Sequence, residues 1–275
     1  MEQLITSAQN PKIKQLLLLQ QKSSERRRTG LFVVEGRREL EHCLAAGYEV
    51  ESLFFIDELG AHSSILNSQF SILNLFKVSP TVYERIAYRG STEGIVAIVR
   101  ERQLTLANLT LPSDALIVVL ERVEKPGNLG AVLRSADAAA ADAVIICDPL
   151  TDLYNPNLIR SSIGACFTVP TVACTSEECI LFLKEHGIRI LTAQLQDSEP
   201  YYESEMRGAT AIVMGTESTG LTDVWRQVAD AHIRIPMQGK LDSLNVSVSA
   251  AILLFEAVRQ RLAPAPCTTP HQSAG

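Results

Sequence analysis

The sequence lacks several of the signatures that identify common enzyme classes directly. Its six cysteines form no CxxC pair, and its five histidines form no HExxH motif. Most of the cysteines lie in apolar segments, which favours small buried hydrophobic residues in a reducing compartment over a disulfide framework or a metal site. No apolar run approaches the roughly 18 residues that a membrane-spanning helix requires, and the start, MEQLITSAQNPKIKQ, has no signal-peptide core. We therefore expect a cytoplasmic protein with no bound metal and no membrane contact.

Positive charge is scarce in the sequence as a whole, but not in its first part. The formal net charge is −6, which taken alone argues against a phosphate-rich partner. Residues 1–110 nevertheless carry 13 Lys and Arg against 12 Asp and Glu, whereas residues 111–275 carry 12 against 19. Positions 11–38 hold eight basic residues and only two acidic ones, which makes this stretch the candidate contact for a polyanion: Lys12, Lys14, Lys22, Arg26, Arg27, Arg28, Arg37 and Arg38.

Length and composition predict two domains. The chain has 275 residues, of which 46% are apolar and 20% are charged, enough for a sizeable core without disulfides. In residues 1–103, expected helices alternate with short apolar strands, which favours a small α/β domain. The first expected helix runs from Asn10 to Gly30. We expect a linker at 104–113, a second domain at 114–263 and a disordered tail at 264–275.

The second domain alternates more regularly. Apolar strands are expected at 115–123, 143–148, 189–196, 210–217 and 232–237, with helices between them and a long helix at 245–263. Continuous apolar strands separated by helices indicate a parallel sheet that is covered on both faces. In such sheets, ligands bind outside the carboxyl ends of the strands, so the loops at those ends are the candidate site.

The first of three unusual loops is ERVEKPGNLGAVLRSAD (121–137), in which Asn128 lies between two glycines and Arg134 follows in a helix. Glycine permits a tight turn and close backbone approach, so the loop is either an ordinary turn or a ligand site. Arg134 is either a surface residue or a contact to phosphate or ribose. The dinucleotide fingerprint GxGxxG is absent, which argues against a nicotinamide-dependent oxidoreductase.

The other two loops are also rich in small polar residues. In VMGTESTGL (213–221) no Lys-Ser or Lys-Thr follows the glycines, so the loop is not a P-loop. It is either a left-handed turn with a solvated Glu217 or a backbone cradle in which Glu217 accepts hydrogen bonds from a ligand. In IPMQGKLDSLNVSVSAA (235–251), Asn245 suits the N-cap of the long helix, and Met237 and Leu244 can line a slot for a flat ring.

Together, and in this order, the three loops resemble the signature motifs of the SpoU/TrmH family, the RNA ribose 2′-O-methyltransferases of the SPOUT superfamily. The resemblance covers about residues 115–262, and NPKIKQL, FVVEG and EGIVAIV are similar to the family's L30e-like substrate-binding extension. The resemblance implies an α/β fold whose C-terminal parallel sheet ends in a deep trefoil knot. It also implies bound S-adenosyl-L-methionine and a homodimer. The matching residues are Asn128, Gly130, Arg134, Gly215, Glu217, Gly220, Leu221, Ser243, Leu244, Asn245 and Ser247.

The resemblance also implies roles for individual residues. A guanidinium stays protonated in proteins, so Arg134 is expected to orient the ribose 2′-OH and stabilise developing negative charge rather than act as a base. Arg134 is further expected to reach a site completed by a partner subunit. The implied catalytic set is Asn128, Arg134, Glu217, Ser243 and Asn245. The implied cofactor contacts are Leu195, Gly215, Glu217, Gly220, Ile235, Met237, Leu244, Asn245 and Ser247.

The sequence says less about which RNA is modified than about the reaction. The L30e-like extension favours ribosomal RNA over transfer RNA by analogy, and the basic stretch at 11–38 is expected to bind it. The alternatives are a tRNA ribose methyltransferase, a non-catalytic RNA-binding protein of the same fold, and a nicotinamide-dependent oxidoreductase.

Overall fold

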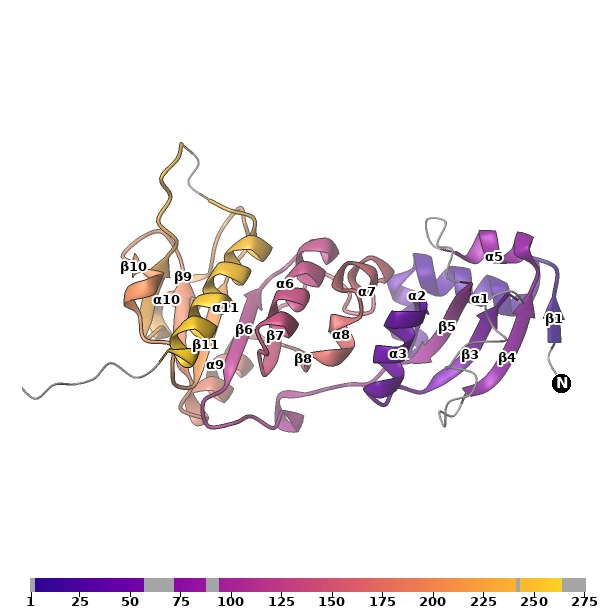
Figure 1. The fold of residues 1–275 in the computed structure, drawn as a ribbon, viewed down its shortest axis with the longest axis horizontal. Coiled ribbons are helices and arrows are strands. Elements are labelled where there is room, and N and C mark those ends of the chain that lie inside the picture. Colours follow the sequence, from indigo (N-terminus) through magenta and orange to yellow (C-terminus); the bar gives the residue numbers. More distant parts are fainter. Residues whose placement is uncertain (1–2, 57–71, 88–93, 241–242, 264–275) are drawn as a thin grey trace, which may run out of the picture.

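The N-terminal part of the chain forms a five-stranded sheet. The computed structural model describes residues 3–56, 72–87, 94–240 and 243–263 (Figure 1). The strand order is β1-β4-β3-β5-β2, with β5 antiparallel to β3 and β2 and the other pairs parallel. The mixed sheet and its helices confirm the expected α/β domain. Its strands are β1 (Gln3–Ile5), β2 (Leu31–Glu35), β3 (Val50–Phe55), β4 (Ile72–Val78) and β5 (Ile95–Arg100), and its helices are α1 (Pro11–Gln21), α2 (Ser23–Thr29), α3 (Arg37–Ala45) and α5 (Pro80–Ile86).

The single helix expected from Asn10 to Gly30 is divided in two. Asn10 caps α1 by accepting a hydrogen bond from the Lys12 amide, and Gly30 ends α2 in a left-handed conformation, so both expected ends are right. Between them, Lys22 is extended. The Arg26 guanidinium donates to the carbonyl oxygens of Leu19 and Gln20, two groups that lose their helical partners where α1 ends.

The C-terminal part forms a seven-stranded, wholly parallel sheet, as the apolar strands predicted. Its order is β10-β12-β9-β11-β6-β7-β8. The strands are β6 (Leu116–Glu121), β7 (Ala143–Cys147), β8 (Thr171–Cys174), β9 (Arg189–Ala193), β10 (Glu199–Pro200), β11 (Thr210–Met214) and β12 (Ala231–Arg234). The helices are α6 (Pro126–Ala138), α7 (Pro156–Ser162), α8 (Ala165–Thr168), α9 (Ser176–Glu185), α10 (Asp223–Val228) and α11 (Val246–Leu262), with short 3-10 helices at Leu106–Asn108 and Tyr201–Glu203.

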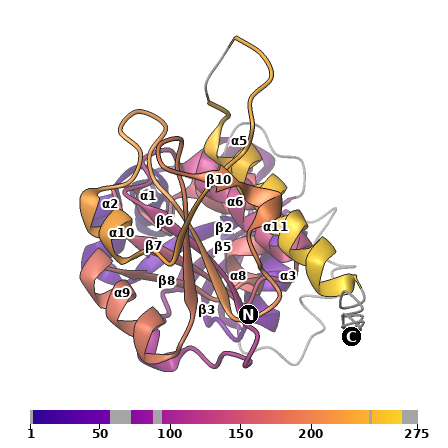
Figure 2. The same cartoon turned by 90° about the vertical axis from the view of Figure 1, so that its left-hand side faces the viewer.

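Helices cover both faces of this sheet (Figure 2). On one face, Leu116, Val118 and Leu120 of β6 pack in a core with α6, α7, α8 and α11. On the other face, Ile117 and Val119 pack in a core with α9 and α10. The alternation within β6 follows from the two-residue period of a strand, and burial on both sides explains why its sequence is apolar throughout.

The two sheets are joined by a buried interface. The Phe32 ring of β2 stacks on Tyr154 with ring centroids 4.3 Å apart, and Phe167 of α8 packs beside it at 6.1 Å. Next to these rings, the Arg26 guanidinium forms a 2.7 Å ion pair with Asp152. The segment expected as a linker is partly ordered, because Leu106, Leu109 and Leu111 pack against the core that includes α9 and α10.

Two expectations depend on residues outside the described ranges, and a third is assessed only within them. The trefoil knot depends on the path of the chain between β12 and α11, which includes residues 241–242, and it stays a prediction. The disordered tail at 264–275 lies outside the described residues. Within the described ranges, no helix combines the length and the apolar character needed to cross a membrane.

Candidate active site

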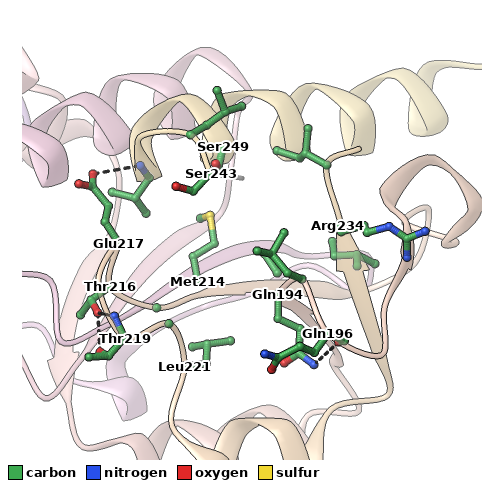
Figure 3. Close-up of a pocket in the computed structure, with 18 of the residues that line it drawn as sticks. Gln194, Gln196, Met214, Thr216, Glu217, Thr219, Leu221, Arg234, Ser243 and Ser249 are labelled. Carbon is green, nitrogen blue, oxygen red and sulfur yellow. Dashed lines mark hydrogen bonds between the residues drawn. The ribbon is translucent and has the colours of Figure 1, made fainter. Parts of the chain in front are cut away.

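A cavity of about 430 Å³ opens at the carboxyl edge of the parallel sheet, where the sequence predicted a site. It is formed by the segments that follow β9, β11 and β12, together with the start of α11 (Figure 3). Its walls combine apolar side chains with small polar ones. Of the predicted cofactor contacts, the lining includes Leu195, Gly215, Glu217, Gly220, Ile235, Met237 and Leu244, and the predicted catalytic Ser243 is also present.

Glu217 joins all three predicted loops. Its Oε1 accepts hydrogen bonds from Asn128 Nδ2 at 3.0 Å and from Asn245 Nδ2 at 2.7 Å. Asn245 Nδ2 also lies 3.2 Å from Asn128 Oδ1, and the Lys125 ammonium is 3.7 Å from Glu217 Oε2. Residues 89 and 117 positions apart in the sequence therefore form one polar cluster at the edge of the cavity.

Asn245 also caps α11, as its residue type suggested. Its Oδ1 accepts hydrogen bonds from the Ser247 amide at 3.0 Å and from the Ser247 hydroxyl at 2.6 Å. Asn245 and Ser247 thus lie beside the described cavity lining rather than in it. One side chain therefore makes both sets of contacts: the Asn245 oxygen accepts the capping hydrogen bonds of α11, and the Asn245 nitrogen donates to Glu217.

The GTESTGL loop is closed tightly by its two glycines. The Gly220 amide donates to the Thr216 carbonyl at 3.0 Å, and Gly220 has φ +67°. A Cβ on Gly215 would lie only 2.2 Å from the Gly220 backbone, a distance that no side chain tolerates. Gly215 therefore permits the chain to fold back on itself. Because it has no side chain, its backbone atoms directly form part of the cavity wall.

Glu121, which the sequence analysis passed over, anchors this loop from below. It is buried at the end of β6, where its carboxylate accepts hydrogen bonds from the Thr222 amide at 2.8 Å and the Thr222 hydroxyl at 2.6 Å. Ser176 of α9 lies within 3.4 Å of the same carboxylate. A charged residue at the end of an otherwise apolar strand was the signal that could have identified it.

A second cavity of about 290 Å³ shares the Gly215–Ser218 wall with the first and extends towards Lys125 and Asn128. Arg134 is exposed on α6, and neither cavity, as the described residues define them, includes it in the lining. This position is compatible with the expectation that Arg134 completes a site only together with another subunit.

For Gly130 the sequence allowed a tight turn or close backbone approach, and the structure shows close approach rather than a turn. It lies within α6, where a Cβ would come within 1.9 Å of Ser161 Oγ and 2.8 Å of the Ser162 amide nitrogen. Its function in the fold is therefore to let α6 and α7 approach closely.

The predicted RNA-binding residues separate into two groups. The exposed members are Lys14 on α1, Lys22 between α1 and α2, Arg27 and Arg28 on α2, and Arg38 on α3. Lys12 and Arg37 are half-buried. The prediction that Arg26 binds RNA is wrong. Arg26 is only 4% exposed, and its side chain pairs with Asp152 and donates a hydrogen bond to the Gln20 carbonyl at the end of α1. A buried, paired guanidinium is not available to a phosphate, so Arg26 belongs to the domain interface.

The fold and the cavity define a two-domain α/β protein with a ligand site at the carboxyl edge of a parallel sheet. Residues 115–255 match the SpoU rRNA Methylase family, and residues 10–97 match the MRM3-like substrate binding domain. The chain belongs to the SpoU rRNA methylase family, as the three loops predicted.

Relatives with named activities align over nearly the whole chain. It is 30% identical to the 23S rRNA (guanosine(2553)-2′-O)-methyltransferase RlmP of Bacillus subtilis, over 91% of this chain and 97% of the relative. It is 28% identical to the 23S rRNA (uridine(2479)-2′-O)-methyltransferase of Streptomyces viridochromogenes, over 96% and 95% of the two chains. The AdoMet-bound rRNA methyltransferase of Sinorhizobium meliloti superposes with a TM-score of 0.86 at 28% identity, over 95% and 99% of the two chains.

Proposed function

We propose that this protein methylates the 2′-hydroxyl of a ribose in ribosomal RNA, with S-adenosyl-L-methionine as methyl donor. The observation that carries the proposal is the Asn128–Glu217–Asn245 cluster at the rim of a cavity in a SpoU-family domain. Relatives that align over nearly the full chain are named as 23S rRNA 2′-O-methyltransferases, and this favours ribosomal over transfer RNA. The cytoplasmic location expected from the sequence stays a prediction.

The residues of the larger cavity fit the cofactor. Gln194 Oε1 is buried in its wall and has no hydrogen-bond partner among the described residues, so it can accept from a donor such as an adenine amino group. Ile235, Met237 and Leu244 offer an apolar surface for a flat ring, and the bare backbone of Gly215 allows close approach. We assign the adenosine part of the cofactor to these residues.

The cofactor supplies an electrophilic methyl group, so the protein has to position the ribose hydroxyl and stabilise the charge that develops on it. A guanidinium stays protonated and cannot act as a simple base. We therefore assign Arg134 to orienting the 2′-hydroxyl and its neighbouring phosphate and to stabilising the developing alkoxide. The hydroxyl proton passes to that phosphate or to solvent. Glu217 holds the amides of Asn128 and Asn245, and Ser243 provides a further hydroxyl at the cavity wall.

The exposed face of α11 supports the homodimer implied by the family resemblance. Val248, Phe255 and Leu262 are exposed by 46%, 48% and 81%, and they recur every seven residues, which places them on one side of the helix. Burial of this stripe against a second copy would remove it from water and bring another chain near α6. Sedimentation of the purified protein measures its oligomeric state.

RNA contact is assigned to the exposed cations of the first domain. We take residues 1–103 as the RNA-binding unit and 114–263 as the methyltransferase unit, with Lys14, Lys22, Arg27, Arg28 and Arg38 as the described exposed cations of the basic stretch. Arg28 is paired with Glu25 at 2.5 Å and Arg38 with Glu39 at 3.3 Å, so the remaining three carry the larger share of unneutralised charge.

The proposal is tested by Arg134→Ala. We expect turnover of a ribosomal RNA substrate to fall by about 10²–10³-fold, the usual cost of removing one group that stabilises transition-state charge. The affinity for the cofactor, measured by calorimetry, should change little because Arg134 lies outside the cavity lining. Lys184→Ala, which removes an exposed cation from α9, is the control. Methyl transfer by Arg134→Ala at the unmodified rate would refute the assignment.

A further inference from the structure

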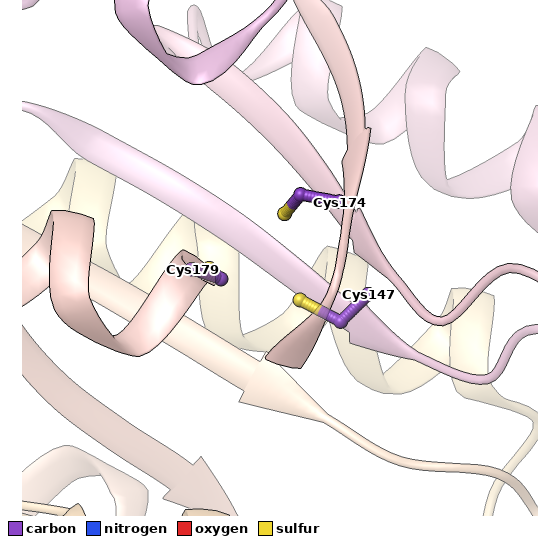
Figure 4. A group of neighbouring side chains, drawn as sticks. All are labelled: Cys147, Cys174 and Cys179. Carbon is purple, nitrogen blue, oxygen red and sulfur yellow. The ribbon is translucent and has the colours of Figure 1, made fainter. Parts of the chain in front are cut away.

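Three cysteines that are distant in the sequence meet in the second domain. Cys147 ends β7, Cys174 ends β8, and Cys179 lies in the first half of α9 (Figure 4). Their sulfur atoms all lie within 4.8 Å of one another. Cys147 and Cys174 are direct partners in the parallel ladder, so their side chains leave the same face of the sheet, and α9 covers that face. The remaining described cysteines, Cys43 and Cys166, lie in the separate core at the domain interface.

We propose that Cys147, Cys174 and Cys179 form a binding site for a soft d10 cation, Zn²⁺ or Cu⁺, held by three thiolates. Thiolate is the ligand that such ions prefer. Sulfur atoms bound at about 2.3 Å to one tetrahedral ion are about 3.8 Å apart, so ligation requires the present cluster to contract by at most about 1 Å. Rotation about the side-chain bonds of α9 and the strand ends can supply this movement. The ligands lose their protons to solvent as the ion binds.

The surroundings of the cluster favour a cation. Two carboxylates adjoin the proposed ligands in the sequence, since Asp148 follows Cys147 and Glu178 precedes Cys179. Those two carboxylates are held in place, since Glu178 accepts from the Thr175 amide at 2.8 Å and Asp148 accepts from the Ser176 hydroxyl at 2.7 Å. A cation therefore meets a preformed region of negative potential.

The exposure of the three side chains suits ion entry. Cys147 and Cys179 are fully buried, whereas Cys174 is half-buried and so gives access from solvent. Cu⁺ is satisfied by three thiolates. Zn²⁺ requires a fourth ligand, which water can supply on the side of Cys174. In either case the ion would tie β7, β8 and α9 together beside Ser176, which hydrogen-bonds towards Glu121 below the GTESTGL loop.

The test uses the full chain, reduced and stripped of metal, with Cys267→Ser introduced throughout because that position lies outside the described residues. Zn²⁺ and Cu⁺ are titrated separately by equilibrium dialysis, and Co²⁺ reports thiolate ligation by its charge-transfer absorption. We expect one equivalent of ion per chain. Loss of an outer-shell partner alone costs about 10–100-fold in metal affinity, so Cys174→Ser and Cys179→Ala should weaken binding at least about a hundredfold. Whichever of Zn²⁺ and Cu⁺ has the lower dissociation constant is the ion that the site prefers.

Cys166→Ala is the matched control, because it removes a half-buried thiol from a different core. It should bind the ion as the parent does. The melting temperature of the parent should rise with metal concentration, while that of Cys174→Ser should not, and this second measurement separates ligation from a folding defect. Absence of binding by the parent, or undiminished binding by Cys174→Ser, would overturn the proposal. A disulfide between two of these thiols after mild oxidation, together with no ion binding to the reduced chain, would also overturn the proposal.

Discussion

At the scale of single residues, Glu217 holds together the loops around the cavity. Glu217 Oε1 accepts hydrogen bonds from Asn128 and Asn245, and it also lies 3.3 Å from the Val246 amide at the start of α11. One carboxylate therefore satisfies a free helix-end amide and fixes two neighbouring carboxamides. Gly215 has the complementary role, since the absence of a side chain is what lets the loop close against Gly220.

At this scale we predict the effect of Gly215→Ala. The added methyl would lie 2.2 Å from the Gly220 backbone, so the loop has to open and the cavity wall has to move. Cofactor affinity, measured by calorimetry, should fall at least about tenfold, since a displacement of about 1 Å at a binding site is costly. Gly208→Ala is the control, because its Cβ would have no atom within 4 Å. Equal affinity of Gly215→Ala and the parent would contradict this account of the loop.

At the scale of elements, the approach of α6 to α7 positions the first loop. Gly130 lies where the two helices touch, and its missing side chain brings Ser161 and Ser162 close to the α6 backbone. Asn128 lies two residues before Gly130 in the same helix, so the packing of α6 determines where Asn128 meets Glu217.

Gly130→Ala tests this contact. Alanine has a helix propensity better than glycine by about 1 kcal/mol, so an exposed site would gain stability. Here the methyl would overlap Ser161, and overpacking typically costs about 1–3 kcal/mol, so we expect a net loss in the free energy of unfolding. Gly127→Ala in the same helix meets no atom within 4 Å and should be neutral or stabilising. Denaturant titration of both variants measures the difference, and a stabilised Gly130→Ala would be incompatible with the packing described.

At the scale of the whole molecule, an acidic protein is expected to bind RNA through a local surface. The net charge of −6 belongs mainly to the second domain, while Lys14, Lys22 and Arg27 are exposed on the first. The stacked rings of Phe32 and Tyr154 and the ion pair of Arg26 with Asp152 join this surface to the methyltransferase domain. We therefore expect the buried junction to hold RNA that binds the first domain within reach of the second.

Salt titration distinguishes the two kinds of basic residue. Each lysine that contacts a phosphate contributes about 1 to the slope of log K against log salt, so Lys14→Gln and Lys22→Gln should weaken RNA binding and lower that slope. Arg26→Gln should leave the slope unchanged. It should instead lower the free energy of unfolding by about 3–5 kcal/mol, because Asp152 is left without its buried partner. A smaller slope of log K against log salt for Arg26→Gln would show that Arg26 contacts RNA after all.

Much of this protein could be predicted from its sequence. The parallel sheet follows from strands such as β6 and β7, whose residues are apolar throughout because both faces are covered. The cap at Asn245 and the three polar loops were also identified from local residue types, because capping and turn formation depend on neighbours in the chain.

Only the tertiary structure decided which of these residues meet. It brought Glu217 to Asn128 and Asn245, buried Arg26 against Asp152, and placed Gly130 between two helices. It also collected Cys147, Cys174 and Cys179, which the sequence showed as separate apolar positions. The physical reason is the same in each case. Composition and period determine which face of an element is buried, whereas contacts between distant residues depend on how the sheets and helices pack in three dimensions.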